Sequence, residues 1–165
     1  MAIVFVRVDD RLIHGQITTA WIADAKASRI VISSDEVAGD SLQKTIINVT
    51  KPPRINVDVL NSEETIQREK SGAWSREKIF LICKYPSDAL QLVRAELGIK
   101  EINVGNVGGM SQHKAGTRKQ IFKSIAVTED DVSVFQEILA AGVGIEIRVT
   151  PRDRQVDMAT LLDKV

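Results

Sequence analysis

Short apolar runs rich in β-branched residues recur along this chain, and segments of helical length separate most of them. The runs cover residues 3–8, 29–33, 55–60, 78–83, 101–104, 124–127 and 144–149. Strands and helices that alternate in this way favour parallel strands joined by right-handed crossovers. We therefore predict an α/β fold with an open, mainly parallel sheet of about six to seven strands and helices on both faces.

Length and composition narrow the possibilities further. The chain has 165 residues, 44% of them hydrophobic, which suits one buried core and is too little for two ordinary domains, so we predict one domain over residues 1–165. Its 22 basic and 22 acidic residues cancel without a run of one sign, which argues against a nucleic-acid partner. The single cysteine, Cys83, and an amino-terminal apolar run interrupted by Arg7 predict a cytoplasmic protein without a signal peptide.

The ends of several helices are marked by their side chains. Three helical segments begin with a residue that can cap the backbone, followed three positions later by one that can complete the cap: Asp40 with Gln43, Asn61 with Glu64, and Thr128 with Asp131. Segments 88–97 and 129–141 are followed by Gly98 and Gly142, which is typical of helix C-termini. These signals agree with the alternation of strands and helices.

The loop after the first predicted strand carries the residues best suited to chemistry. From Asp9 to Gln16 it reads DDRLIHGQ, and a helical pattern resumes at Ile17. His14 therefore lies at or just before a helix N-terminus, where backbone N–H groups and the helix dipole favour negative charge. Open parallel sheets also bind ligands beyond the carboxyl ends of their strands. A phosphorylated histidine fits this position.

The residue types in this loop point to phosphoryl transfer. An unprotonated imidazole is a good nucleophile towards phosphorus, so we predict that His14 accepts a phosphoryl group and passes it on. Arg11 can offer a bidentate guanidinium to the equatorial oxygens of the transferring group. The amides near Gly15 and Gln16 can donate to the same oxygens, and Gly15 lacks a Cβ that would hinder a partner. We therefore expect Gly15, Gln16 and Arg11 to bind phosphate.

Two neighbouring carboxylates precede Arg11. Asp9 or Asp10 could orient Arg11, or could accept a hydrogen bond from the second imidazole nitrogen and so decide which nitrogen attacks. The sequence leaves the choice between them open. We include Asp10 with His14 and Arg11 among the candidate catalytic residues.

These residues also carry a resemblance to a known family. The loop from Asp9 to Gln16 resembles the active-site loop of the IIB component of the bacterial phosphoenolpyruvate-dependent sugar phosphotransferase system of the mannose/fructose/sorbose type. The segments SSDE at residues 33–36 and NVGGM at residues 106–110, together with the chain length, suit the same family. The likeness extends over essentially the whole chain.

The resemblance implies a reaction and a set of partners. His14 would accept the phosphoryl group through Nδ1 from a phosphohistidine of a cognate IIA protein, with Arg11 in a supporting role. It would pass the group to a sugar held by the membrane-embedded IIC and IID components, to which the sugar selection mainly belongs. The protein would then be cytoplasmic and peripherally associated with the membrane permease complex. No metal or nucleotide cofactor is implied for this step.

Other functions remain as alternatives. A nucleotide-binding α/β domain would need a glycine-rich phosphate loop after the first strand, and that turn contains no G-x-G-x-x-G or G-x-x-x-x-G-K-[ST] pattern. A hydrolase with His14 as general base would need a nucleophile or a metal, and no G-x-S-x-G motif or metal-ligand spacing is present. A non-catalytic interaction module that keeps the fold is the remaining alternative.

Several further residues are expected near the same edge of the sheet. The loop 105–116 leaves the fifth predicted strand, and Lys84 and Asp35 follow the fourth and the second. His113 lies in the polar part of that loop and is a weak candidate for a contact with a partner. Trp21 is expected in the core, and Trp74, in a turn region, is expected to pack, with a half-exposed position at an interface as the alternative.

Overall fold

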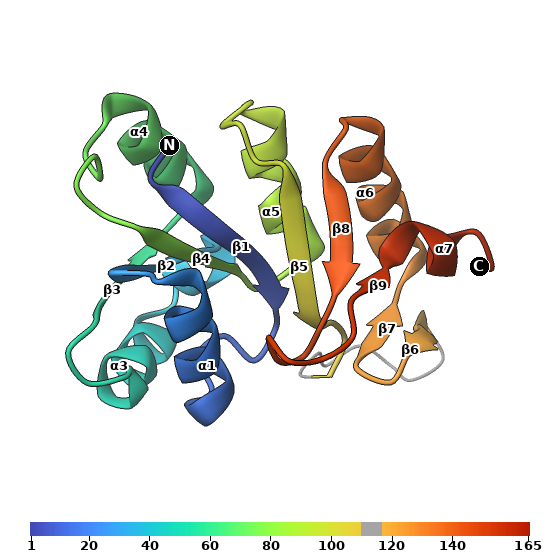
Figure 1. The fold of residues 1–165 in the computed structure, drawn as a ribbon, viewed down its shortest axis with the longest axis horizontal. Coiled ribbons are helices and arrows are strands. Elements are labelled where there is room, and N and C mark those ends of the chain that lie inside the picture. Colours follow the sequence, from blue (N-terminus) through green and yellow to red (C-terminus); the bar gives the residue numbers. More distant parts are fainter. Residues whose placement is uncertain (110–116) are drawn as a thin grey trace.

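A seven-stranded sheet forms the centre of the computed structural model, which describes residues 1–109 and 117–165 (Figure 1). Its strands are β1 (Ile3–Asp9), β2 (Arg29–Ser33), β3 (Asn56–Leu60), β4 (Ile79–Cys83), β5 (Glu101–Asn106), β8 (Gly144–Ile147) and β9 (Val156–Asp157). They lie in the order β3-β2-β4-β1-β5-β8-β9, and every neighbouring pair is parallel except β8 with β9. The predicted α/β fold with a mainly parallel sheet is confirmed.

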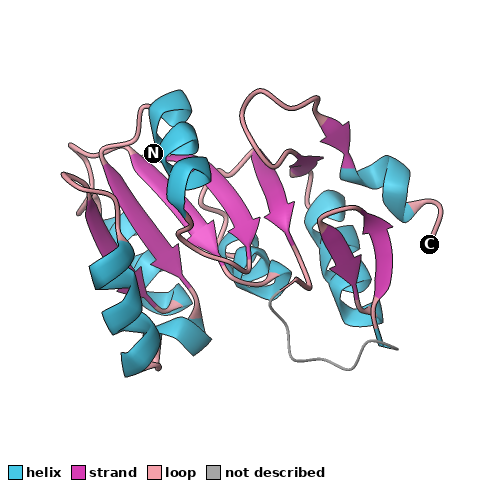
Figure 2. Cartoon of the chain, turned by 90° about the horizontal axis from the view of Figure 1, so that it is seen from below, coloured by secondary structure: helices cyan, strands magenta, loops and turns pink. Residues whose placement is uncertain are grey.

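Helices cover both faces of this sheet, as Figure 2 shows. They are α1 (Gly15–Ala25), α2 (Asp35–Ala38), α3 (Ser41–Thr50), α4 (Ser62–Ser71), α5 (Pro86–Arg94), α6 (Glu129–Ala140) and α7 (Met158–Leu162). The three predicted caps are present, because Asp40, Asn61 and Thr128 each accept a hydrogen bond from a backbone N–H in the first turn of their helix. Segment 88–97 was placed too late, since the helix starts at Pro86, whose missing N–H costs nothing in a first turn.

Two hydrophobic clusters fill the two sides of the sheet. Successive side chains of a strand point to opposite faces, so Ile79, Leu81 and Cys83 of β4 join one cluster while Phe80 and Ile82 join the other. The first cluster includes buried residues of α5 and α6, and the second includes those of α1, α2 and α3. Both tryptophans are buried, which confirms the core position of Trp21 and decides for packing at Trp74.

The order of the strands changes direction around β1. From β1 the chain passes through α1 to β2 on one side, and from β4 it crosses through α5 to β5 on the other. The carboxyl ends of β1, β4 and β5 therefore lie side by side, at the place where open α/β sheets bind ligands. The amide of Asp10 donates to the carbonyl oxygen of Asn106 at 3.1 Å, which joins the loops after β1 and β5.

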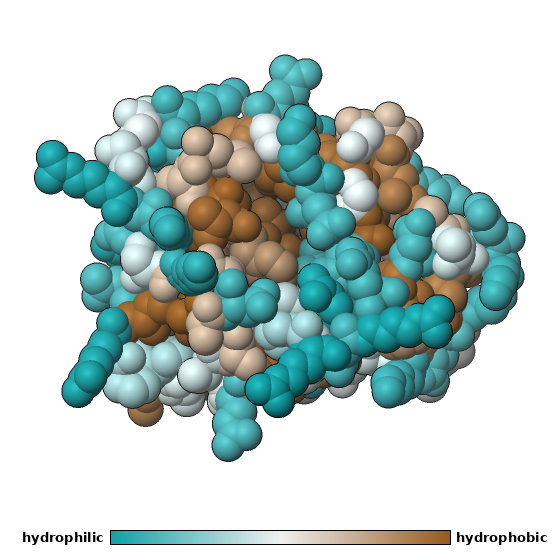
Figure 3. Space-filling view, in the orientation of Figure 1, coloured by the Kyte–Doolittle hydropathy of each residue, from teal (hydrophilic) through white to brown (hydrophobic). Residues whose placement is uncertain are grey.

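The amino-terminal end of β1 is apolar, in contrast to its polar carboxyl end. Apolar side chains gather around β1 on the face seen in Figure 3. Val4, near the amino-terminal end of the strand, is 45% exposed and lines a shallow hollow there. Met1, Phe5 and Ile99 line the same shallow hollow of about 280 Å³. This apolar area lies at the amino-terminal end of β1, away from the end that carries His14.

Two parts of the carboxyl-terminal third differ from the sequence-based expectation. The predicted strand 124–127 forms β7 (Ile125–Val127), which pairs with β6 (Lys119–Phe122) in a two-stranded antiparallel hairpin outside the seven-stranded sheet. One parallel bridge, between Ile125 and Val107, links this hairpin to the segment after β5. The hairpin packs on the core through the buried side chains of Ile125 and Val127. The two-residue strand β9 was not predicted, because so short a segment shows no periodicity.

Candidate active site

The loop between β1 and α1 is pinned to the fold at both ends. His14 is the N-cap residue of α1, with extended backbone angles, so its predicted place just before the helix is confirmed. Leu12 has a left-handed backbone (φ 60°), which a leucine adopts at a cost, and its buried side chain anchors the loop in the second hydrophobic cluster. Gly15 also has a positive φ of 53°, a conformation that glycine adopts without strain.

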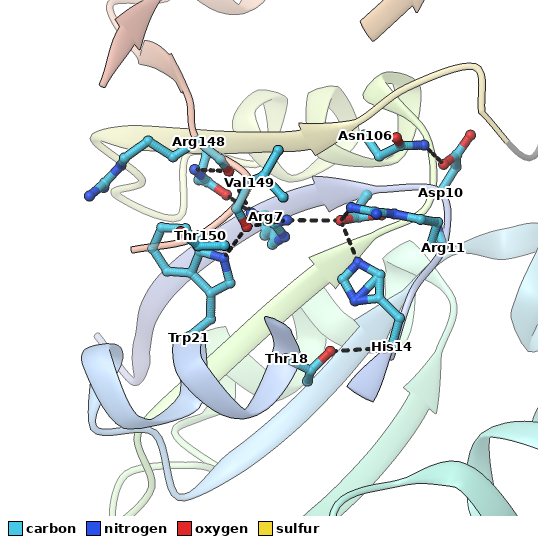
Figure 4. Close-up of polar contacts among 12 residues, drawn as sticks. Arg7, Asp10, Arg11, His14, Thr18, Trp21, Asn106, Arg148, Val149 and Thr150 are labelled. Carbon is cyan, nitrogen blue, oxygen red and sulfur yellow. Dashed lines mark hydrogen bonds and ion pairs between the residues drawn. The ribbon is translucent and has the colours of Figure 1, made fainter. Parts of the chain in front are cut away.

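Asp9, at the end of β1, is the centre of the polar contacts of the site. Figure 4 shows the side chains of Arg7, Arg11 and His14 turned towards one another. Its carboxylate is fully buried and accepts hydrogen bonds from Arg7, Arg11 and His14. Oδ2 is 2.9 Å from Arg7 Nη2, 3.0 Å from Arg11 Nη2 and 3.2 Å from His14 Nε2. A buried carboxylate is stable when it is paired and hydrogen-bonded in this way, so Asp9 can hold the three side chains together.

Arg11 faces Asp9 with the fork of its guanidinium. Nε donates to Oδ1 at 3.1 Å and Nη2 to Oδ2 at 3.0 Å, and the backbone amide of Arg11 also donates to Oδ1. The side chain is 29% exposed, so one edge of the guanidinium still faces solvent. Arg11 is thus oriented beside His14 and can offer donors to an anion that approaches from outside.

The imidazole of His14 is oriented through one of its nitrogens. Nε2 lies 3.2 Å from Asp9 Oδ2, and the backbone amide of His14 donates to Oγ1 of Thr18 at 2.9 Å. Nδ1 is buried and has no hydrogen-bond partner within residues 1–109 and 117–165. Because a carboxylate only accepts, Nε2 carries the proton towards Asp9 and leaves the free electron pair on Nδ1.

Burial also keeps this imidazole neutral. Desolvation lowers the pKa of His14 below its ordinary value of 6.5, the negative charge of Asp9 opposes that effect, and the positive charges of Arg11 and Arg7 lower the pKa further. A lowered pKa means that the unprotonated ring predominates at neutral pH. An unprotonated ring is the form that can attack phosphorus.

The choice between the two aspartates, open in the sequence, is decided by these contacts. Asp9 contacts both Arg11 and His14, whereas the carboxylate of Asp10 accepts a hydrogen bond from Nδ2 of Asn106. Asp10 therefore joins the loop after β1 to the segment after β5, and its predicted catalytic role stays a prediction. Asn106 opens the segment NVGGM, of which Met110 lies outside the described residues.

Arg7 was missed as a site residue by the sequence reasoning. Its guanidinium is 2% exposed and contacts the Asp9 carboxylate from the interior side. The signal was present, because an arginine stands among the apolar residues of a strand predicted to be buried. A buried arginine needs a counter-charge, and the nearest carboxylate on the same face of the strand is Asp9, two positions later.

The remaining candidates lie around this centre. Gln16 and Gly15 are exposed in the first turn of α1, where backbone N–H groups have no partner inside the helix. Lys84 lines a hollow of about 250 Å³ together with Asp10 and Arg11, as expected for residues on one edge of the sheet. Asp35 faces a neighbouring hollow and accepts from Ser62. His113 lies outside the described residues.

Two features are absent from the described part of the chain. No group of three or more His, Cys, Asp or Glu side chains there could hold a metal ion. None of the described helices has both the length and the apolar character needed to span a membrane.

Known proteins match this chain over its full length. The family described as "PTS system sorbose subfamily IIB component" matches residues 3–165. The sorbose-specific EIIB component of Lacticaseibacillus casei is 34% identical and the fructose-specific EIIB component of Bacillus subtilis 35% identical, each over all of this chain and 98% of the relative. The mannose-specific EIIAB component of Escherichia coli (strain K12) is 34% identical, and this chain spans half of that protein.

Solved structures agree with the sequence matches. The IIBSor domain of the sorbose permease from Klebsiella pneumoniae superposes with a TM-score of 0.91 at 30% identity, covering all of this chain and 98% of that one. An N-acetylgalactosamine-specific IIB component from Escherichia coli gives a TM-score of 0.84 at 30% identity, over 94% and 99% of the two chains. None of these matches supports a nucleotide-binding domain or a non-catalytic module. The chain belongs to the sorbose subfamily of IIB components of bacterial sugar phosphotransferase systems, and it is a phosphotransferase that carries a phosphoryl group during sugar uptake.

Proposed function

We propose that Nδ1 of His14 is the atom that carries the phosphoryl group. The observation that supports this assignment most directly is the pairing of Nε2 with Asp9, which leaves the electron pair of the neutral ring on Nδ1. Arg11 stands beside the ring with donors directed outward, and the first-turn amides at Gly15 and Gln16 suit the oxygens of a bound phosphoryl group. These are the parts that phosphoryl transfer needs.

The transfer step can be written with these groups. The electron pair of Nδ1 forms a bond to phosphorus, the bond from phosphorus to the donor imidazole breaks, and the donor nitrogen keeps that electron pair. His14 gains positive character as the bond forms, and the Asp9 carboxylate at Nε2 stabilises it. Because Nδ1 is buried in this structure, the ring or the loop has to move when the donor docks.

The partners follow from the family. IIB components work with IIA partners, and the Escherichia coli mannose relative carries both A and B in its name. The donor would be a phosphohistidine on a cognate IIA protein, and the acceptor a sugar held by membrane components IIC and IID. On this proposal the protein lies in the cytoplasm, against the membrane permease complex. Asp10 would support the site indirectly, through Asn106.

Radiolabelled phosphoenolpyruvate tests the assignment. The protein is incubated with the general phosphotransferase components and a cognate IIA protein, and incorporation is compared for wild type, His14→Ala and His113→Ala. The chain contains two histidines, so His113→Ala is the matched control. Label that is stable in base, lost in acid, retained in His113→Ala and absent from His14→Ala supports the proposal.

The opposite pattern would remove His14 from the mechanism. Label retained in His14→Ala, with NMR spectra showing both variants folded, would place the phosphoryl group elsewhere. The site of attachment is read from the phosphorus-coupled imidazole resonances of the labelled wild type. Attachment at Nε2 would contradict the tautomer inferred from Asp9.

A further inference from the structure

Two arginines hold Asp9, and they differ in burial. Arg11 is 29% exposed and lies in the loop, whereas Arg7 is 2% exposed and lies inside β1. Resting on the proposed function, we infer that Arg7 is a positioning residue of phosphoryl transfer: it holds the Asp9 carboxylate in place, and Asp9 in turn orients the imidazole of His14. Arg7 itself touches neither the ring nor the incoming phosphoryl group.

The guanidinium of Arg7 is fixed from every side. Nη1 donates to Oδ1 of Asn103 and, at 3.0 Å, to the carbonyl oxygen of Arg148, and Nη2 donates to the carbonyl oxygen of Val149 at 3.1 Å. Its plane packs against the backbone of Gly105, where any Cβ would overlap the guanidinium. These acceptors belong to β5 and to the segment after β8, so the position of Arg7 does not depend on the catalytic loop.

Because it is anchored in this way, Arg7 can hold Asp9 while Arg11 binds the phosphoryl group. When a phosphoryl group arrives, the outward donors of Arg11 bind its oxygens, and the positive charge of Arg11 is then shared between the phosphoryl group and Asp9. A fully buried carboxylate that lost its counter-charge would be costly and would reorient or take up a proton. Arg7 stays paired with Oδ2 throughout, so Asp9 keeps its charge and its direction towards Nε2 while Arg11 is engaged elsewhere.

The pairing of Arg7 with Asp9 also affects the pKa and the tautomer of the His14 ring. Within the described residues, the charged groups that act on His14 are Asp9 and Arg7 from β1 and Arg11 from the loop. Removing the charge of Arg7 removes one of the two cationic influences that lower the pKa of His14, so that pKa should rise. Loss of the fixed Asp9 should also let the neutral ring populate both tautomers, because Asp9 is the acceptor that holds the proton on Nε2.

The test compares Arg7→Met and Arg7→Lys with wild type, all on a His113→Ala background so that one imidazole is observed. Nitrogen-15 NMR of the ring gives the tautomer and the pKa of His14, and quenched-flow mixing with phosphorylated IIA gives the transfer rate. We expect Arg7→Met to mix the tautomers, to raise the pKa, and to slow transfer at pH 8 by roughly tenfold or more. Arg7→Lys should keep the pKa near that of wild type, because the charge remains, and lose part of the rate.

A stability control separates positioning from folding. Trp74→Phe perturbs the buried core near the amino-terminal end of β4, away from the site, and should leave the tautomer and the pKa of His14 unchanged. Arg7→Lys keeps the experiment decisive if Arg7→Met does not fold. Wild-type tautomer and rate in a folded Arg7 variant would overturn the inference, whereas wild type that takes no label at His14 would overturn the proposed function instead.

Discussion

Two buried carboxylates lie at the carboxyl ends of neighbouring parallel strands, and they differ in whether an opposite charge compensates them. Asp9 ends β1 and pairs with the guanidinium groups of Arg7 and Arg11. Asp88 lies in the first turn of α5, just after β4, and its carboxylate accepts from the amide of Tyr85. Burial, with a smaller contribution from the charge of Asp35, raises the pKa of Asp88 to about 6.

The difference shows when a buried carboxylate can act as an anion that orients other side chains. Desolvation disfavours both charges, but two arginines compensate Asp9, so it can orient other groups as an anion. Asp88 has only hydrogen bonds and a neighbouring carboxylate, so it takes up a proton more readily. The same edge of the sheet therefore holds one carboxylate that organises chemistry and one that costs stability when it ionises.

The largest effect is expected when the Asp9 pairing is broken. Asp9→Asn keeps the shape of the side chain but removes the ion-pair partner of the buried Arg7, which should destabilise the fold by about 3–5 kcal/mol. The variant should also lose most phosphoryl transfer, because His14 is no longer oriented. Urea unfolding and label incorporation measure the two effects. Asp10→Asn is the matched control, and its stability and transfer should change much less. Equal losses of stability and transfer in both variants would contradict the central role of Asp9.

The second prediction removes the charge of Asp88. In the folded protein this carboxyl keeps its proton up to pH about 6, against an ordinary value of 3.8, so it contributes stability at low pH that is lost as the pH rises through about 6. Asp88→Asn keeps an acceptor for the Tyr85 amide and should be more stable than wild type at pH 8 by on the order of 2 kcal/mol. The gain should vanish near pH 4. Unfolding curves of both proteins at pH 8 and pH 4 measure this gain. A gain of the same size at both pH values would contradict the prediction.

The smallest effect concerns the exposed partner of Asp9. Arg11→Lys keeps the charge and loses the bidentate fork, so transfer to His14 should slow by about tenfold while stability changes by less than about 1 kcal/mol. Single-turnover transfer and thermal unfolding provide the comparison. An unchanged transfer rate would remove Arg11 from the mechanism, and a large loss of stability would show that Arg11 also holds the fold together.

Local signals predicted most of the elements. Apolar runs rich in β-branched residues predicted the central strands, and Asp40, Asn61 and Thr128 marked helix starts that the structure confirms. The signals did not show which strand pairs with which. The strand at residues 125–127 is apolar like the others, but its partner is the adjacent hairpin strand, which only the packed structure shows.

The sequence alone determined the alternating fold and the loop that carries His14 and Arg11, because both rest on short-range patterns: the periodicity of apolar residues and a run of eight chemically distinctive ones. It could not choose between Asp9 and Asp10, or give Arg7 a role. Those assignments depend on which strands lie side by side. Asn103 and Gly105 of β5 and the carbonyl groups after β8 surround Arg7 only once the sheet is assembled, and that arrangement decides which carboxylate faces the histidine.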